Sequence, residues 1–343
     1  MFSSIICRCH RCLFTGWGKR TGVEDPIIET LRSLASALAI EDSELKLLFG
    51  ALGVILLGFG HFRASSKGSI FAIIGWPMIG LHFYMDVPHY VEIQDPVLIL
   101  MTAAGLPLTI AVAVWDGRNI SRGIEDEALI WARGAIALAT GPYLIMAHVP
   151  IFNVIAVWIT AWSANSFLAF SGHDGYVIGS MLVDTGTADV LWSEWDGNRW
   201  ILTQQLGEAG FHTPLLDQTS GQPTVSFVMA CSAAQSMAVF IGALFAIRTA
   251  PWQRRMRALL VTVPTIFVLN TFRNAGIVWL HITYPHWDLL GVTMFDFAHS
   301  YAAKAGSLFA MFLMALVLFD LLPEMHRHIM RLIKPISDLR SAT

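Results

Sequence analysis

The sequence predicts an all-α polytopic integral membrane protein with about seven transmembrane helices, an interfacial helix and a small β-containing extracytoplasmic cap. Of its 343 residues, 55% are hydrophobic and only 14% are charged, and the mean hydropathy is +0.57. Because a soluble domain usually carries roughly 25% charged residues, an ordinary soluble enzyme is excluded. The apolar runs approach the length of about 20 residues that crosses a bilayer, which favours membrane spans over a buried core.

Residues 1–44 are expected to form a poorly ordered N-terminal extension. Basic residues interrupt its apolar stretches, so it lacks the uninterrupted apolar core of a secretory signal. Cys7, Cys9, His10 and Cys12 crowd together there. Structural zinc sites usually separate paired cysteines by two to four residues, whereas Cys7 and Cys9 have one residue between them. We therefore expect no metal site and no cofactor.

Seven uncharged or nearly uncharged runs are predicted to span the membrane, at 47–60, 69–85, 97–114, 129–147, 226–247, 258–280 and 298–321. An eighth apolar stretch, 149–162, is interrupted by Asn153, and we interpret it as an interfacial helix. The predicted organisation after the extension is membrane helices with the interfacial helix (45–171), a cap (172–225), catalytic membrane helices (226–322) and a cytoplasmic tail (323–343).

The orientation follows from the loop 248–257, which holds four arginines and no acidic residue. Short loops rich in arginine and lysine stay in the cytoplasm, so this loop is assigned to the inside and 172–225 to the outside. The outer segment is polar and rich in Gly, Asp, Thr and Trp. It predicts a β-rich cap, with a hairpin turn at Asp196 and Gly197.

Three side chains of reactive types are predicted to share one depth near the outer face. Cys231 lies five residues inside its predicted span, roughly 8 Å deep, and Arg273 lies seven residues before the outer end of its span, roughly 10 Å deep. His299 opens the next span, and the short connection keeps the last two helices adjacent. An arginine inside the hydrocarbon persists only when it faces a partner or a wet cavity. The shared depth favours one functional site made of Cys231, Arg273 and His299 over the alternatives of an inert cysteine and an interfacial histidine.

A polar stripe accompanies these three residues. Asn270, Arg273 and Asn274 stand at i, i+3 and i+4, which is one face of a helix. Gln235 stands one helical turn beyond Cys231, so it is expected on the same face as the cysteine. Gln235, Asn270 and Asn274 are predicted to support the catalytic residues or to contact the substrate.

The segments 230–237 (ACSAAQSM) and 270–274 (NTFRN), followed by His299, resemble the exosortase and archaeosortase transpeptidases, the archaeosortase branch in particular. In helix layout the resemblance extends over about 45–324. In this family a hydroxyl residue and a glycine commonly follow the cysteine, whereas here Ser232 is followed by Ala233. The resemblance implies a multi-pass cell-membrane enzyme that cleaves the C-terminal sorting signal of exported proteins and joins the new C-terminus to a membrane lipid.

The predicted function is a membrane-embedded cysteine protease and transpeptidase with its active site toward the extracytoplasmic face. Cys231 is predicted to form a thioester with the substrate, which a lipid or another nucleophile resolves. Arg273 would stabilise the thiolate or the oxyanion, and His299 would act as general acid and base. The expected partners are exported proteins with a hydrophobic C-terminal helix and a lipid acceptor. A net charge of −3 gives no attraction for nucleic acid, which is not expected as a partner.

Two alternatives from other classes stay open. An intramembrane arginine also marks transporters of anionic solutes, which would tolerate the loss of Cys231. A membrane acyltransferase that uses His299 as its base would leave Cys231 as a packing residue.

Overall fold

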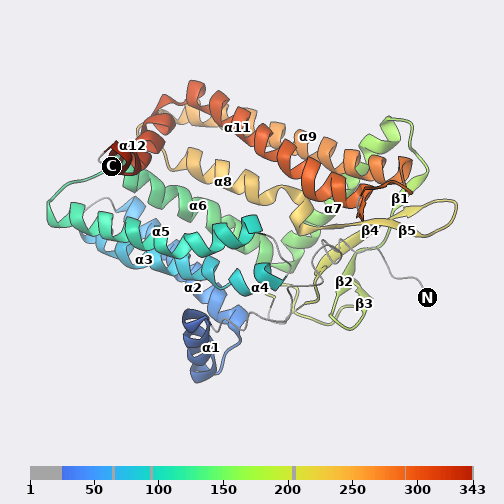
Figure 1. The fold of residues 1–343 in the computed structure, drawn as a ribbon, viewed down its shortest axis with the longest axis horizontal. Helices are drawn as coiled ribbons and strands as arrows, with labels where there is room; N and C mark the ends of the chain where they lie inside the picture. Colours follow the sequence, from blue (N-terminus) through green and yellow to red (C-terminus); the bar gives the residue numbers. More distant parts are fainter. Residues whose placement is uncertain (1–24, 64–65, 93–95, 203–205, 290, 342–343) are drawn as a thin grey trace. The chain divides into compact units, whose positions relative to one another are not determined.

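The computed structural model describes residues 25–341 apart from 64–65, 93–95, 203–205 and 290. Helices dominate it, and a small strand-containing region lies between α7 and α8 in the chain (Figure 1). The cysteine-rich segment Cys7 to Cys12 lies outside the described residues. Among the described residues, seven helical segments are long and apolar enough to cross a membrane: Asp42–Phe62, Ile70–Glu92, Pro96–Ser121, Glu127–His148, Pro150–Phe170, Trp252–Thr283 and Met294–Leu321. The protein is a polytopic helical membrane protein, as the sequence predicts.

The fifth predicted span and the interfacial helix are both corrected by the structure. Helix α7 (Pro150–Phe170) has 21 residues and is long and apolar enough to cross a membrane, although Asn153 interrupts its apolar run. The side chain of Asn153 is buried, so it faces protein and leaves the helix unbroken. The predicted span 226–247 instead divides into a strand, a turn of 3₁₀-helix and the 12-residue helix α8 (Ala234–Phe245).

The chain forms two compact units, which are described separately. The first consists mainly of 22–144, 237–263 and 313–343. It contains α1 (Pro26–Leu38), α2 (Asp42–Phe62), α3 (Ser66–Tyr84), α4 (Val87–Glu92), α5 (Pro96–Ser121), most of α6 (Glu127–His148) and of α8, the start of α9 (Trp252–Thr283), the end of α11 (Ala303–Leu321), and α12 (Pro323–Ser341). Helix α1 lies within the predicted N-terminal extension, and its apolar face buries Ile28, Leu31 and Ala35.

Helices α2, α3 and α5 pack closely in this unit because small residues face their neighbours. A Cβ added at Gly53 would lie 2.7 Å from the side chain of Ile79, so only glycine allows this approach of α2 to α3. A buried ion pair joins α5 to α6, where the guanidinium of Arg133 donates to both carboxylate oxygens of Asp116. Trp76 Nε1 donates to the same carboxylate at 3.1 Å, which ties α3 into the pair.

The second unit contains the described ranges Ile145–Ser236 and Pro264–Phe312. Its five-stranded sheet is antiparallel in the order β1 (Tyr176–Ile178), β4 (Phe211–Asp217), β2 (Leu182–Asp184), β3 (Asp189–Leu191), and β5 (Pro223–Val228) pairs with β4. A separate two-stranded sheet consists of β6 (Asp288–Leu289) and β7 (Val292–Thr293). The strand-rich segment is thus found where the sequence predicts a cap. Strands β2 and β3 turn at Gly186, which has φ +83°. The predicted hairpin at Asp196 and Gly197 is wrong, because this segment turns back to stack Trp195 on Trp192.

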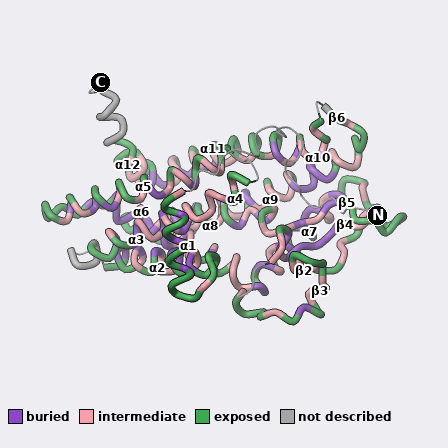
Figure 2. Tube along the Cα trace, turned by 60° about the horizontal axis from the view of Figure 1, so that its bottom comes forward, coloured by how far each residue is buried: buried purple, intermediate pink, exposed green. Residues whose placement is uncertain are grey.

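The core of the second unit lies between α7, the sheet and the C-terminal half of α9. Figure 2 shows buried positions along α7, β4 and β5. The buried apolar side chains include Val157, Ala161, Ala164 and Leu168 of α7, Leu215, Val225 and Phe227 of the sheet, and Ala275, Ile277 and Val278 of α9. Phe295 and Ala298 join them from α10 (Met294–Asp296) and from the π-helix η2 (Phe297–Ala302). Chain segments that are distant in sequence therefore meet around the end of β5.

Candidate active site

Cys231 lies at a break in the backbone between a strand and a helix. Strand β5 ends at Val228, the 3₁₀ turn η1 covers Met229–Ser232, and α8 begins at Ala234. Between η1 and α8, Ala233 has φ +54°, the left-handed conformation that L-residues adopt at a cost. Ser232 holds this turn, since its Oγ donates to the carbonyl of Met229 at 2.7 Å and accepts from the N–H of Ala234 at 3.2 Å.

This break corrects the expected relation between Cys231 and Gln235. The spacing of the two residues predicts that they lie on one helix, one turn apart. In the structure Gln235 is an exposed residue in the first turn of α8, on the other side of the left-handed residue. Gln235 is therefore not among the residues that the structure brings to the cavity beside Cys231.

Two asparagines of α9 hold the carbonyl group of Cys231. Asn270 Nδ2 donates to this oxygen at 2.8 Å, and Asn274 Nδ2 donates to it at 2.9 Å. In an uninterrupted helix the same carbonyl would accept from a backbone N–H four residues later. The two side chains thus supply the hydrogen bonds that the break in the helix removes. The polar stripe predicted on α9 contacts the cysteine segment at this point.

Arg273 lies between these asparagines in sequence, on the flank of α9. It is half-buried, and its Nη1 lies 3.5 Å from Oδ1 of Asn274. Its Nε is buried without a hydrogen-bond partner among the described residues. A buried guanidinium N–H that lacks an acceptor is costly, and a bound anionic group would satisfy it. The positive charge of Arg273 favours the ionised form of the Cys231 thiol and so acts to lower its pKa.

His299 stands on η2, a short π-helix at the start of the helical segment that continues as α11. Its ring stacks on Phe295, with ring centroids 5.6 Å apart and planes inclined by 6°. Single-turn π segments inside helices are frequently found at functional sites. Here the stacking on Phe295 fixes the orientation of the imidazole.

A cavity of about 20 Å³ joins these groups. It is lined by residues of β5, η1, α9, α10 and η2. They are Val225, Ser226 and Phe227 of β5; Cys231 of η1; Asn274, Ile277 and Val278 of α9; Phe295 of α10; and His299 of η2. This volume holds about one water molecule. The structure thus brings Cys231, Asn274 and His299 around one small space. Ser226 and Phe295 were missed in the sequence analysis, although the alternation of apolar residues from Thr224 to Val228 is the signal of a strand.

The environment of the Cys231 thiol opposes its ionisation. Burial raises the pKa of this thiol, while a hydrogen bond from the backbone of Val228 and the charge of Arg273 act in the opposite direction. The thiolate is the nucleophilic form of cysteine, so these two contacts favour the reactive state. Among the described residues no three His, Cys, Asp or Glu side chains are arranged to hold a metal ion.

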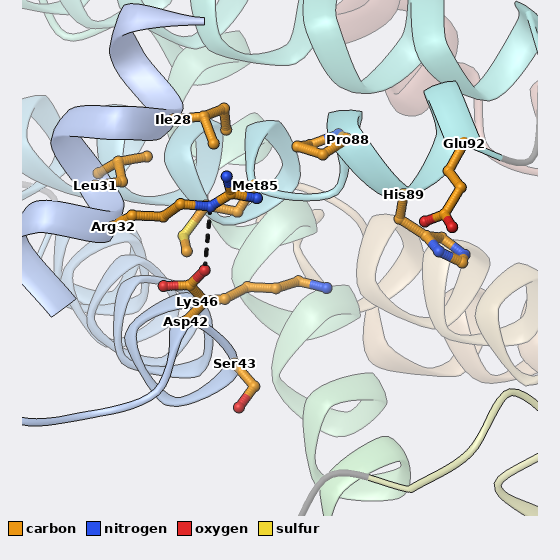
Figure 3. A pocket seen from close by; sticks show the side chains of 10 residues that line it. All are labelled: Ile28, Leu31, Arg32, Asp42, Ser43, Lys46, Met85, Pro88, His89 and Glu92. Carbon is orange, nitrogen blue, oxygen red and sulfur yellow. Dashed lines mark ion pairs between the residues drawn. The ribbon is translucent and has the colours of Figure 1, made fainter. Parts of the chain in front are cut away.

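A larger cavity of about 260 Å³ lies in the first unit between α1, α2 and α4 (Figure 3). Three of its charged side chains pair with groups of opposite sign. Arg32 Nε lies 3.4 Å from a carboxylate oxygen of Asp42, and Lys46 pairs with Asp86. Because most of the charges that line this cavity are paired, we assign no chemistry to it.

Comparisons with known proteins point to one family. Residues 214–319 match the family model described as transmembrane exosortase. The chain is 23% identical over 206 residues to a protein named Archaeosortase A from Haloferax volcanii, and the match covers 59% of this chain and 59% of the relative's length. The search of solved structures gave no significant match. The segment that matches the family model contains Cys231, Asn270, Arg273, Asn274 and His299.

Proposed function

We propose that this chain, whose assignment to the exosortase and archaeosortase family both comparisons support, is a membrane-embedded cysteine transpeptidase. The observation that carries the proposal is the convergence of Cys231, Asn274 and His299 on one cavity, with the guanidinium of Arg273 in contact with Asn274. The substrate is an exported protein with a C-terminal sorting signal that includes a hydrophobic helix. The acceptor is a membrane lipid, and the site opens toward the extracytoplasmic face.

In the first half of the reaction, Cys231 attacks the carbonyl carbon of the peptide bond that precedes the hydrophobic helix. His299 accepts the thiol proton, and the new S–C bond places a negative charge on the carbonyl oxygen. The guanidinium of Arg273, whose Nε has no acceptor among the described residues, donates to this oxyanion. The C–N bond then breaks, His299 gives its proton to the leaving amine, and a thioester remains on Cys231.

In the second half, the acceptor resolves the thioester. His299, neutral again, removes a proton from the hydroxyl or amine of the acceptor, whose oxygen or nitrogen attacks the thioester carbonyl. The same oxyanion contacts act a second time. The C–S bond breaks, the thiolate takes back the proton from His299, and the substrate is released with the acceptor on its new C-terminus.

The test compares cells that carry the wild-type chain with cells that carry Cys231→Ala. Mass spectrometry of C-terminal peptides identifies membrane proteins that retain their hydrophobic C-terminal helix only in the variant. We expect such precursors to accumulate, while the variant inserts at the wild-type level because one sulfur atom contributes little to packing. Normal processing by Cys231→Ala would refute the covalent mechanism and favour a transporter or a histidine-dependent acyltransferase.

A further inference from the structure

We propose that the free edge of β5 binds the main chain of the substrate as an added β-strand and so leads the scissile carbonyl to Cys231. The inference rests on the proposed function and names how that site recognises its substrate. Within the described part of the chain, β5 pairs with β4 alone, so one of its two edges is not occupied by a strand. Such an edge presents main-chain donors and acceptors to another extended chain.

The residues opposite one another in the sheet show which groups point to the free edge. Ser226 lies opposite Pro214 of β4. Proline has no N–H, so these two residues cannot exchange the two hydrogen bonds of a bonded antiparallel pair. The carbonyl of Pro214 instead accepts from the N–H of Gly179 at 2.7 Å, on the opposite edge of β4. The N–H and the C=O of Ser226 therefore point away from β4.

Cys231 lies on the same edge. Val228 is two residues beyond Ser226 and has the same orientation, because main-chain groups alternate along a strand. Cys231 follows three residues later, on η1, and lines the same cavity as Ser226. A substrate strand that pairs with Ser226 would bring its next main-chain groups beside the nucleophile.

The lining of the cavity supports this arrangement. Val225, Ser226 and Phe227 are consecutive residues, and their side chains alternate between the two faces of the sheet, yet all three line the cavity that contains Cys231 and His299. Three consecutive residues share a cavity most simply when it borders the strand's edge. With about 20 Å³ the cavity accepts an atom group of the size of a carbonyl oxygen, not a side chain.

The occupant is an extended peptide segment for a chemical reason. A cysteine nucleophile must approach a peptide carbonyl whose own hydrogen bonds are not enclosed in a helix. Pairing with a strand holds a peptide extended and satisfies its main-chain groups beside the apolar residues of the core. The segment bound is the one that directly precedes the hydrophobic helix of the substrate.

The experiment separates the N–H of Ser226 from its side chain. All variants carry serine at Cys7, Cys9 and Cys12, so that Cys231 is the one thiol. Ser226→Pro removes the edge-facing N–H at a position where an edge strand tolerates proline, and Ser226→Ala keeps it. We expect Ser226→Pro to slow processing about tenfold, equivalent to about 1.4 kcal/mol. The rate of Ser226→Pro is therefore compared with that of Ser226→Ala, which loses the hydroxyl group and keeps the N–H.

Two further measurements decide the remaining outcomes. Alkylation of Cys231 by iodoacetamide needs no strand pairing, so its rate should be the same in both variants. Processing by Ser226→Pro at the parent rate, with alkylation unchanged, would overturn the proposal, while the Cys231→Ala test of the function would be unaffected.

If Ser226→Pro also changes the alkylation rate, a photo-cross-linker decides whether the substrate lies along β5. A cross-linker placed at Thr224 in the Cys231→Ala chain should capture the precursors that accumulate in that variant. A cross-linker placed at Ser193 in the same chain should not capture them. Equal capture at both positions would refute strand pairing.

Discussion

The two asparagines that hold the Cys231 carbonyl allow a quantitative test of the site. Asn270→Ala and Asn274→Ala each remove one of two hydrogen bonds to the same oxygen. In either single variant the oxygen keeps one donor, so the loss is that of one hydrogen bond, about 1 kcal/mol. In the double variant the carbonyl at the broken helix has neither donor, which adds a further cost of about 1–3 kcal/mol. The two substitutions should therefore be strongly non-additive.

The assay measures both the reactivity and the productive placement of Cys231. Release of the cysteine turn further exposes a thiol that is partly buried in the parent chain, so alkylation by iodoacetamide should become faster while processing of substrate falls. Each single variant should change the alkylation rate about fivefold, and the double variant should exceed the product of the two changes by about fivefold or more. Thr271→Ala is the control, because its Oγ1 bonds to the carbonyl of Phe267 within α9. It should change the rate by about twofold at most.

Additivity would contradict this reasoning. If the free-energy changes of the two single variants sum to that of the double variant within about 0.5 kcal/mol, Asn270 and Asn274 do not share one acceptor in the membrane-embedded protein. Slower alkylation in the double variant would show that the asparagines do not hold Cys231 in its partly buried position.

Four other predictions follow. Arg273→Lys should lose nearly as much processing as Arg273→Ala, because an ammonium lacks the planar donor fork, and near-normal turnover would show that charge alone suffices. Arg273→Ala should move the pH profile of Cys231 alkylation to higher pH, since this cation opposes the rise of the thiol pKa caused by burial; an unshifted profile would show that its charge does not reach the thiol. Ala233→Gly should raise the thermal midpoint, because glycine removes most of the cost of about 1–2 kcal/mol for an L-residue at φ +54°, and a lower midpoint would mean that the Ala233 methyl group contributes more by packing. On intact cells, an impermeant thiol reagent should label a cysteine placed at Ser193 but not one placed at Gln253, and the opposite pattern would invert the proposed orientation.

The membrane class and most of its spans could be predicted because run length is a one-dimensional property. The fifth span could not, because hydropathy does not distinguish a helix from a strand followed by a turn. Val225 and Phe227 are buried in the core while Ser226 and Val228 are less so, which is the pattern of β5. Helix α7 was predicted as an interfacial helix and not as a span, because a polar residue such as Asn153 lowers the local hydropathy without breaking the helix.

The residues of the candidate site could be selected from the sequence, but the contacts between them could only partly be predicted. The spacing of Asn270 and Asn274 predicts a shared helix face, and both contact one oxygen of the cysteine turn. The prediction that Gln235 shares a helix face with Cys231 is wrong, because a single left-handed residue, Ala233, separates the two. The glycine that commonly follows in the resembled family stands where this chain has Ala233. A glycine at this position is a conformational signal, since glycine adopts positive φ without the cost that alanine pays.

The irregular backbone on both sides of the cavity explains why α9 is central to the site. Cys231 stands on a 3₁₀ turn and His299 on a π-helix, and neither segment completes the regular hydrogen-bonding pattern of an α-helix. Helix α9 is continuous from Trp252 to Thr283 and supplies both the donors that hold Cys231 and the guanidinium of Arg273, which contacts Asn274. A regular helix thus sets the distances, while the irregular segments allow the nucleophile and the histidine to point into a cavity that two uninterrupted helices would fill with side chains.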